Sequence, residues 1–286
     1  MNKIIFYFLI LPIAFLPYSV LYIIADIFAF IIFDLIGYRN KIINKNINQS
    51  FPEKTTQQIK MIKKKFYSHF MDLIVESFKG FIINEATIKN RLQVNNQELV
   101  DQYYQNGRSI ILVGGHYNNW EICAQCAPLH CKHQLLAIYK KLKNKFFDNK
   151  IRKSREKFGL KMIPMRESKK YFINNTDQSF GVIFGSDQSP SNPKKAYWLR
   201  FLNQDTGVLF GAEKYAKEFN WPVIYVGMSK FKRGHYMVKY QLVSDDPSTT
   251  SHGDITKKFT QFLEKDIQEE PSNWLWTHNR WKRKKP

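Results

Sequence analysis

Cysteine is scarce in this chain of 286 residues, which contains only three. Three cysteines cannot form a disulfide framework, because one of them would stay unpaired. Disulfides persist in oxidising compartments, so their shortage favours a chain with reduced thiols that faces the cytoplasm. The sequence also lacks internal repeats and low-complexity linkers, and no boundary divides residues 46–286 into two domains.

Acidic side chains are few as well. There are 24 Asp and Glu against 44 Lys and Arg, which leaves a formal net charge of +20 and a pI near 9.7. A charge of this size indicates an anionic partner: nucleic acid, an anionic membrane, phosphate groups or an acidic protein. Hydrophobic residues make up 44% of the chain and aromatic residues 15%, which excludes global disorder.

The N-terminal region carries an uncharged apolar stretch of 22 residues, from Ile4 to Ala25. A helix of that length, at about 1.5 Å per residue, could cross the hydrocarbon core of a bilayer. Pro12 and Pro17 argue against one straight helix, and Asp26 and Asp34 interrupt the apolar residues that follow. The stretch is too long for a cleaved secretory signal and has no small-residue cleavage site after it.

Two interpretations remain for this stretch, a buried core helix and a membrane anchor. Its length and its flanking charges favour the anchor. Lys3 precedes it, whereas Arg39, Lys41 and Lys45 follow, which places the part that follows on the cytoplasmic side. We therefore expect residues 1–45 to form a membrane anchor, spanning or re-entrant, and residues 46–286 to form one domain on the cytoplasmic side.

The rest of the chain alternates between helical and strand patterns. Residues 54–80 predict an amphipathic helix with a lysine cluster at 60 and 63–65, which is either a solvated face or a contact with anionic headgroups. Apolar runs predict strands and helical periods predict helices in this order: strand 109–113, a helix from about 118, strand 134–139, a basic helix over about 143–158, strand 180–184, helix 206–219 and a hairpin of strands 222–229 and 235–243.

This alternation predicts an α/β fold: a central, mostly parallel or mixed sheet with helices on both faces. In such sheets the chemistry collects in loops at the carboxyl ends of strands. That rule points to the loop after Val113 and the loop after Phe184. The basic helix over about 143–158 lies in a segment, residues 140–161, with ten Lys and Arg, and we expect it to lie over the sheet with a cationic outer face.

The first loop reads Gly-Gly-His-Tyr-Asn-Asn-Trp-Glu, with His116 and Glu121 five residues apart. Asn118 and Asn119 are both candidate N-caps, so His116 would lie in the turn and Glu121 in the first turns of the helix. The imidazole could then fold back onto the carboxylate, which would fix its tautomer and let its other nitrogen accept a proton. The alternative is purely structural, with His116 and Glu121 serving only the helix end.

These residues resemble the His-x4-acid motif of glycerolipid acyltransferases, and with Asn-Trp-Glu specifically the lipid A late acyltransferase family (the lauroyl and myristoyl transferases). Three further blocks are similar to that family in the same order: residues 139–159, in which Arg155 best matches a functional arginine and Arg152 is the second choice; residues 185–188, with Asp187 in the acidic position; and residues 271–282, a closing Trp-x-His-x-Arg-x-Lys segment. The N-terminal apolar segment also fits.

The resemblance implies a glycerolipid acyltransferase-like fold at the cytoplasmic face of the inner membrane. It also implies transfer of an acyl chain from a thioester, usually on acyl-carrier protein, to a hydroxyl of a lipid A precursor or a related membrane lipid. No cofactor or metal is implied. The implied catalytic pair is His116 as general base and Glu121, with substrate-binding, oxyanion or positioning roles for Arg155, Asp187, Asn119 and Arg152.

Two other function classes compete. Aromatic residues interleaved with Lys and Arg near the C-terminus, together with the net charge, are compatible with nucleic-acid binding, but no recognised nucleic-acid motif is present and an apolar anchor is unexpected there. Metal binding is suggested by Cys123, Cys126, His130, Cys131 and His133. The Cys123–Cys126 spacing is ligand-like, but no second ligand pair follows at finger spacing, so we expect small buried thiols and no nucleic acid.

Overall fold

A computed structural model describes residues 2–175 and 177–286 of the chain. Its centre is a seven-stranded sheet with the strand order β1-β9-β8-β2-β5-β3-β4. The strands are β1 (Leu92–Asn95), β2 (Ile110–Gly114), β3 (Gln134–Tyr139), β4 (Lys161–Pro164), β5 (Phe180–Gly185), β8 (Val223–Lys232) and β9 (His235–Ser244). All neighbouring strands run parallel except β8 and β9, which form an antiparallel hairpin. The predicted α/β class with a mostly parallel sheet is therefore confirmed.

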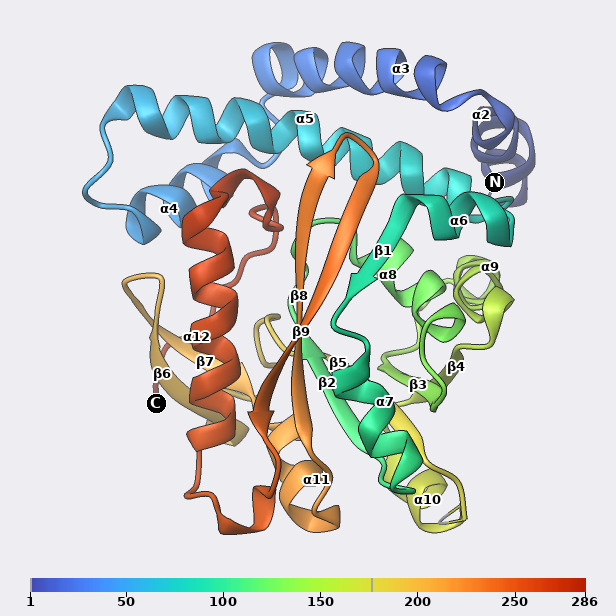
Figure 1. The fold of residues 1–286 in the computed structure, drawn as a ribbon. Coiled ribbons are helices and arrows are strands. Elements are labelled where there is room, and N and C mark those ends of the chain that lie inside the picture. The colour runs from blue at the N-terminus through green and yellow to red at the C-terminus, as the bar shows by residue number, and fades with distance from the viewer. Residues whose placement is uncertain (1, 176) are drawn as a thin grey trace.

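Helices cover both faces of the sheet (Figure 1). Alternating side chains of β2 separate the two cores: Ile111 and Val113 face one cluster, and Ile110 and Leu112 face the other, as the two-residue period of a strand requires. The helices on the first face are α4 (Asn40–Ser50), α11 (Gly211–Phe219) and α12 (Asp254–Glu269), and those on the second are α6 (Glu85–Arg91), α7 (Glu98–Gln105) and α8 (Trp120–Cys126).

Several predicted elements recur almost residue for residue, including β3 and the β8–β9 hairpin, whereas the predicted helix over 206–219 is partly wrong. Residues 204–209 form strand β7 (Gln204–Leu209), which pairs antiparallel with β6 (Ala196–Phe201) in a separate two-stranded sheet, and only α11 is helical. The turn between them places Leu202 and Asn203 at positive φ, 48° and 60°, as a tight hairpin turn demands. The β-branched Thr206 and Val208 suit a strand better than a helix.

The basic helix also lies elsewhere than expected. It is α9 (Lys145–Arg155), followed by a short 3₁₀ turn (Glu156–Phe158), and it packs against α8 and the N-terminal helix α1 (Asn2–Ile5) instead of lying directly over the sheet. Two further contacts hold it in place, because Ser154 Oγ donates to the carbonyl of Gly80 and accepts from the side-chain amide of Gln125. A short helix, α10 (Ser168–Ile173), connects β4 to β5.

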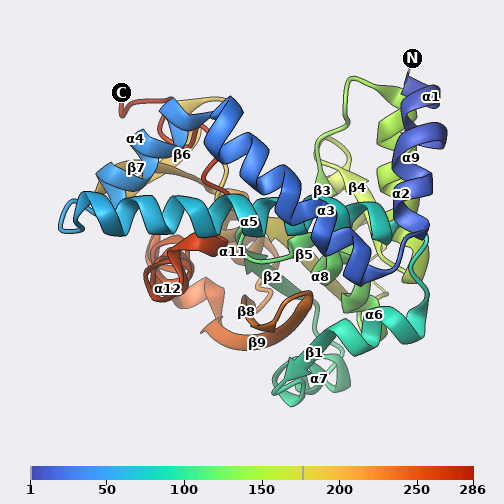
Figure 2. The ribbon, with the colours of Figure 1, turned by 90° about the horizontal axis from the view of Figure 1, so that it is seen from above.

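The N-terminal segment forms an outer layer of helices. After α1 come a π-helical turn (Phe6–Ile10), α2 (Leu11–Phe15), α3 (Tyr18–Phe30) and a second π-helical turn (Ile31–Ile36), and the long α5 (Thr56–Gly80) lies beneath them. Figures 1 and 2 show α3 and α5 lying across the end of the sheet toward which β8 points. Within the described residues, one helical stretch, Tyr18–Ile36, is long and apolar enough to cross a membrane, with a mean hydropathy of 2.3.

Candidate active site

The site forms where β2 and β5 end side by side. These strands pair in register from Ile110 with Gly181 to Gly114 with Gly185, so the loops that follow them leave the sheet together. The amide of Ser186 donates to the carbonyl of Gly114 at 3.1 Å and joins the two loops. Gly115 allows close packing here, because a Cβ at this position would lie 2.7 Å from the δ carbons of Leu263 and 3.3 Å from Asp187 Oδ2. The two loops selected from the sequence therefore do meet.

The first loop turns sharply before α8. Asn118 adopts a left-handed conformation with φ of 52°, which asparagine tolerates better than most residues. Asn119 is the N-cap, and its Oδ1 accepts from the amide of Ile122 at 2.9 Å. Its side-chain amide donates to the buried carboxylate of Glu76. Because Asn119 is 2% exposed, it positions the turn and does not line the cavity.

The imidazole of His116 pairs with Asp187, not with Glu121. His116 Nδ1 lies 2.6 Å from Asp187 Oδ1, and the backbone amide of His116 donates to Asp187 Oδ2 at 2.8 Å. Trp274 Nε1 donates to the same Oδ2 at 2.8 Å. The expectation that the ring folds onto Glu121 is therefore wrong in its geometry, because the neighbouring β5 loop delivers a carboxylate on the side to which the ring turns.

Glu121 has a different partner, Arg155. The guanidinium of Arg155 binds both oxygens of Glu121, with Nε at 2.9 Å from Oε2 and Nη2 on Oε1. Trp120 stands between the two pairs: its ring packs edge-on against the imidazole of His116, with centroids 5.1 Å apart, and its Nε1 donates to Glu121 Oε1. The site thus contains two ion pairs side by side. Arg152 lies one turn earlier on α9 and pairs with Glu156.

These pairs shift the pKa values of their members. Burial disfavours the charged imidazole, but the carboxylate of Asp187 outweighs this and raises the pKa of His116. Burial acts against the carboxylate of Asp187 too, but His116 and the hydrogen bonds from its backbone and from Trp274 lower the pKa of Asp187. In the same way Arg155 lowers the pKa of Glu121 despite burial. Both carboxylates are therefore charged at neutral pH.

The tautomer of His116 follows from these contacts. A charged Asp187 can only accept, so Nδ1 carries the proton and Nε2 of the neutral ring is an acceptor. Nε2 lies 3.1 Å from the side-chain amide of Gln188. Gln188 follows Asp187 directly within the third motif block, although no role was predicted for it from the sequence. Gln188 therefore occupies the side of the imidazole ring opposite Asp187.

A cavity of about 710 Å³ opens beside His116, a size typical of small-molecule sites. Its inner wall is apolar and comes from the second face of the sheet, from α8 and from the residue after α8. Cys123 and Ala124 of α8 and the following Ala127 leave space there because their side chains are small. Its open side is basic, because the exposed Lys140, Lys141 and Lys143 line it, and the partly buried Arg152 and Arg155 line the cavity as well. An elongated apolar ligand with a charged or polar head would match this distribution.

The C-terminal block, residues 271–282, contacts both loops of the site. The amide of Leu275 donates to the carbonyl of His116 at 3.2 Å, and Trp274 donates to Asp187. His278 Nε2 accepts from the amide of Ser189 at 2.9 Å and so holds the loop after Asp187. Burial lowers the pKa of His278 to about 4, against the opposing effect of Asp187, so this ring is a neutral acceptor. Two segments that are far apart in the sequence, around His116 and around Trp274, thus both contact the carboxylate of Asp187.

Glu76 is a site residue that sequence reasoning missed. It is buried on α5 and binds the side-chain amide of Asn119 and the hydroxyl of Tyr236, the latter at 2.9 Å. The signal was present, since Glu76 is an acidic residue on the apolar side of an otherwise amphipathic helix. The cysteines lie near α8, with Cys126 and Cys131 buried in the second core, and across residues 2–175 and 177–286 no three potential metal ligands come together.

Comparison with known families supports the resemblance seen in the motifs. The family model described as bacterial lipid A biosynthesis acyltransferase matches residues 3–283, nearly the whole chain. No curated protein matches the chain.

Proposed function

Because this chain belongs to the bacterial lipid A biosynthesis acyltransferase family, we propose that it transfers a fatty acyl chain from a thioester to a hydroxyl of a lipid A precursor. The expected carrier of the thioester is acyl-carrier protein. One observation supports this proposal most strongly: His116 is held by Asp187 through Nδ1, while its Nε2 faces a cavity that is basic at the entrance and apolar inside.

In the proposed reaction Nε2 of His116 takes the proton from the acceptor hydroxyl. The hydroxyl oxygen attacks the thioester carbonyl, the carbon–sulfur bond breaks, and the proton passes from the imidazolium to the departing thiolate. Asp187 stabilises the imidazolium that forms between these events, since its carboxylate lies 2.6 Å from Nδ1. The hydroxyl must first displace the amide of Gln188 from Nε2.

Arg155 is proposed to stabilise the charge that develops on the carbonyl oxygen or to bind a phosphate of the donor or acceptor. Its guanidinium is planar and permanently charged, which suits both tasks better than a lysine would. Glu121 holds it in place through two hydrogen bonds. In this assignment Glu121 is a positioning residue that acts through Arg155, and it is not the direct partner of the base.

The entrance suits an acidic carrier. Lys140, Lys141 and Lys143 line the cavity on the segment before α9, where they could receive the phosphate of a carrier-bound thioester and acidic side chains of the carrier. We place the enzyme at the cytoplasmic face of the inner membrane. The apolar stretch Tyr18–Ile36 supports contact with the membrane, and the shortage of cysteine supports the cytoplasmic side.

The experiment that tests this function has two parts. Mass spectrometry of whole-cell lipids, with and without the gene, should show lipid A lacking one acyl chain when the gene is absent. The purified full chain, given an acyl-carrier-protein thioester and the lipid A recovered from the deletion strain, should restore that chain. If lipid A is normal and another hydroxyl-bearing lipid is changed instead, the proposal of acyl transfer would stand, but lipid A precursor would be the wrong acceptor. No change in any lipid would overturn the function.

A further inference from the structure

The N-terminal apolar helices are bound to the α/β domain by polar contacts along their length. Near the break before Pro17, Lys79 of α5 donates to the carbonyls of Ala14 at 2.9 Å and Leu16 at 2.8 Å. These carbonyls lie at the end of α2, where no intrahelical partner is available. At the other end of this segment Lys150 of α9 donates to the hydroxyl of Tyr7 at 3.0 Å.

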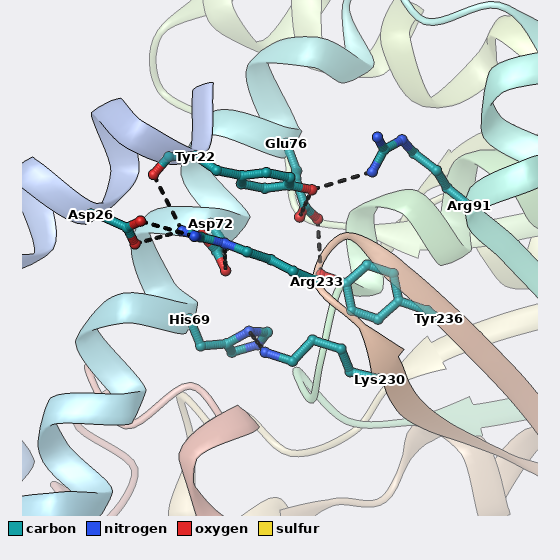
Figure 3. A network of polar contacts seen from close by, with 9 residues as sticks. All are labelled: Tyr22, Asp26, His69, Asp72, Glu76, Arg91, Lys230, Arg233 and Tyr236. Atoms are coloured by element: carbon teal, nitrogen blue, oxygen red, sulfur yellow. Dashed lines mark hydrogen bonds and ion pairs between the residues drawn. The ribbon is translucent and has the colours of Figure 1, made fainter. Parts of the chain in front are cut away.

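A stronger contact fixes α3. Arg233, at the tip of the β8–β9 hairpin, binds Asp26 through Nη1 and Nη2 at 2.9 and 2.7 Å, and it also binds Asp72 of α5 (Figure 3). Tyr22, one turn before Asp26, donates to Glu76 at 2.9 Å. The charged side chain that interrupts the apolar helix is thus neutralised by an arginine of the catalytic domain, so α3 is docked on that domain at its centre.

The outer face of α3 is nevertheless apolar. Leu21, Ala25 and Ala29 point inward and are buried, whereas a stripe formed by Val20, Ile23, Ile27 and Phe30 is 38–59% exposed. We call these four residues the outer stripe. They recur at steps of three and four and therefore share one side of the helix. A docked helix normally has a polar outer face, so the outer stripe indicates an apolar environment on that side.

Basic side chains lie beyond the Phe30 end of the outer stripe, near Phe33. Lys60, Lys64 and Lys65 are exposed on the half of α5 that lies along the end of the segment, and Lys63 stacks over the ring of Phe33 at 5.8 Å. Lysines beside an exposed apolar face are typical of helices that lie at the surface of an anionic bilayer. This distribution selects lipid, with acyl chains on the stripe and anionic headgroups on the lysines, over a second protein.

We propose that residues 2–36 lie in the plane of one leaflet, with the outer stripe among its acyl chains, and do not cross the bilayer. The Asp26–Arg233 pair then fixes the orientation of the catalytic domain, because the layer of α3 and α5 lies at the same end of the sheet as His116. This inference extends the proposed function, on which it rests, by stating how the enzyme meets the leaflet that holds its lipid acceptor.

A depth measurement tests the proposal. The native cysteines are replaced, single cysteines at Val20, Ile23, Ile27 and Phe30 are labelled with the fluorophore NBD, and the full chain is bound to phosphatidylcholine–phosphatidylglycerol vesicles carrying nitroxides at carbon 5 or carbon 12 of the acyl chains. Positions 20 and 30 are about 15 Å apart along the helix, half the thickness of a hydrocarbon core of about 30 Å.

An in-plane helix predicts that all four probes are quenched, with the same ratio between the shallow and the deep nitroxide. A ratio that changes steadily from position 20 to position 30 would show a crossing or re-entrant helix and overturn the proposal. Absence of quenching, with a doubled mass by light scattering, would overturn it in favour of a second copy covering the outer stripe.

A matched pair of variants tests the orienting role of the Asp26–Arg233 pair. Asp26→Asn removes the charge that binds Arg233, whereas Asp34→Asn makes the same change on an exposed aspartate of the same segment for which no ion pair is formed among the described residues. We expect Asp26→Asn to spread the four quenching ratios and Asp34→Asn to leave them equal. Identical behaviour of the two variants would remove that role. Since these measurements need neither donor nor acceptor, their outcome is independent of whether acyl transfer is observed.

Discussion

Asp187→Asn is the substitution that separates the observed site from the one expected from the motif. Asp187 accepts three hydrogen bonds, from His116 Nδ1, from the His116 amide and from Trp274 Nε1. Asparagine has nearly the same shape but offers one acceptor oxygen and one amino group. At least one of the three donors therefore faces another donor in the variant, and the imidazolium formed during the reaction loses its counter-charge.

The size of the effect can be worked out from these contacts. A hydrogen bond to a charged group contributes about 1.5–3 kcal/mol, and the bond between Nδ1 and Asp187 strengthens as the ring becomes charged. Loss of that one bond predicts a decrease in kcat/KM of about 10- to 150-fold, since about 1.4 kcal/mol corresponds to a factor of ten. Lost orientation of the ring would add to this decrease.

The pH dependence gives the sharper result. His116 must be neutral to accept a proton, so kcat/KM falls as the pH drops through the pKa of the free enzyme. Burial lowers the pKa of His116, but Asp187 more than compensates and the net shift is upward. Without the charge of Asp187 the effect of burial remains, so the pKa falls and the acid limb of the profile moves to lower pH.

The assay follows acyl transfer by the purified full chain over a range of pH, with Asp205→Asn as control because Asp205 is 71% exposed on β7. Thermal melts show whether each variant is folded. A normal rate and an unmoved acid limb in Asp187→Asn would refute the assignment. If Glu121→Gln moved the limb instead, Glu121 would be the partner of the base after all.

Three further substitutions address other parts of the site. Gln188→Glu places a carboxylate next to Nε2 of His116 and should move the acid limb to higher pH, opposite to Asp187→Asn; an unchanged profile would separate Gln188 from the base. Ala124→Leu should fill the inner cavity and lower kcat/KM for the longest accepted chain about fourfold per displaced methylene, from about 0.8 kcal/mol each; an unaltered chain-length series would place the acyl chain elsewhere. Arg155→Ala should reduce transfer far more than Lys153→Ala; equal, mild effects would make α9 only a charged surface.

Much of the fold could be read from apolar periodicity. The buried runs over β2, β3 and β5 consist almost wholly of apolar side chains, and the β8–β9 hairpin shows strand patterns on both sides of a glycine turn. Strand β7 was missed because its polar start resembles a helix cap and α11 follows almost at once. The sequence of residues 204–209 alone does not indicate that β6 pairs with them to form a two-stranded sheet.

The sequence indicated which side chains to examine, but it did not indicate how they pair. His116 and Glu121 were selected from the loop after β2, and Arg155 and Asp187 from the family resemblance, but the local spacing of five suggested the wrong carboxylate for the imidazole. The correct pairing depends on β5 lying next to β2, which follows from the strand order and not from either loop. Glu76 escaped notice for the same reason, since its partners come from α8 and β9.

The central claim is that His116 is the base of an acyl transfer reaction, and His116→Ala tests it most directly. The variant should fold and bind vesicles like the native chain, because the ring contacts Asp187, Gln188 and Trp120 at the end of the sheet and is not part of either core cluster. We predict that its turnover with an acyl thioester and the lipid A precursor falls by about 10²- to 10⁴-fold, the usual contribution of a general base. Near-native turnover in a folded, membrane-bound His116→Ala variant would contradict this role.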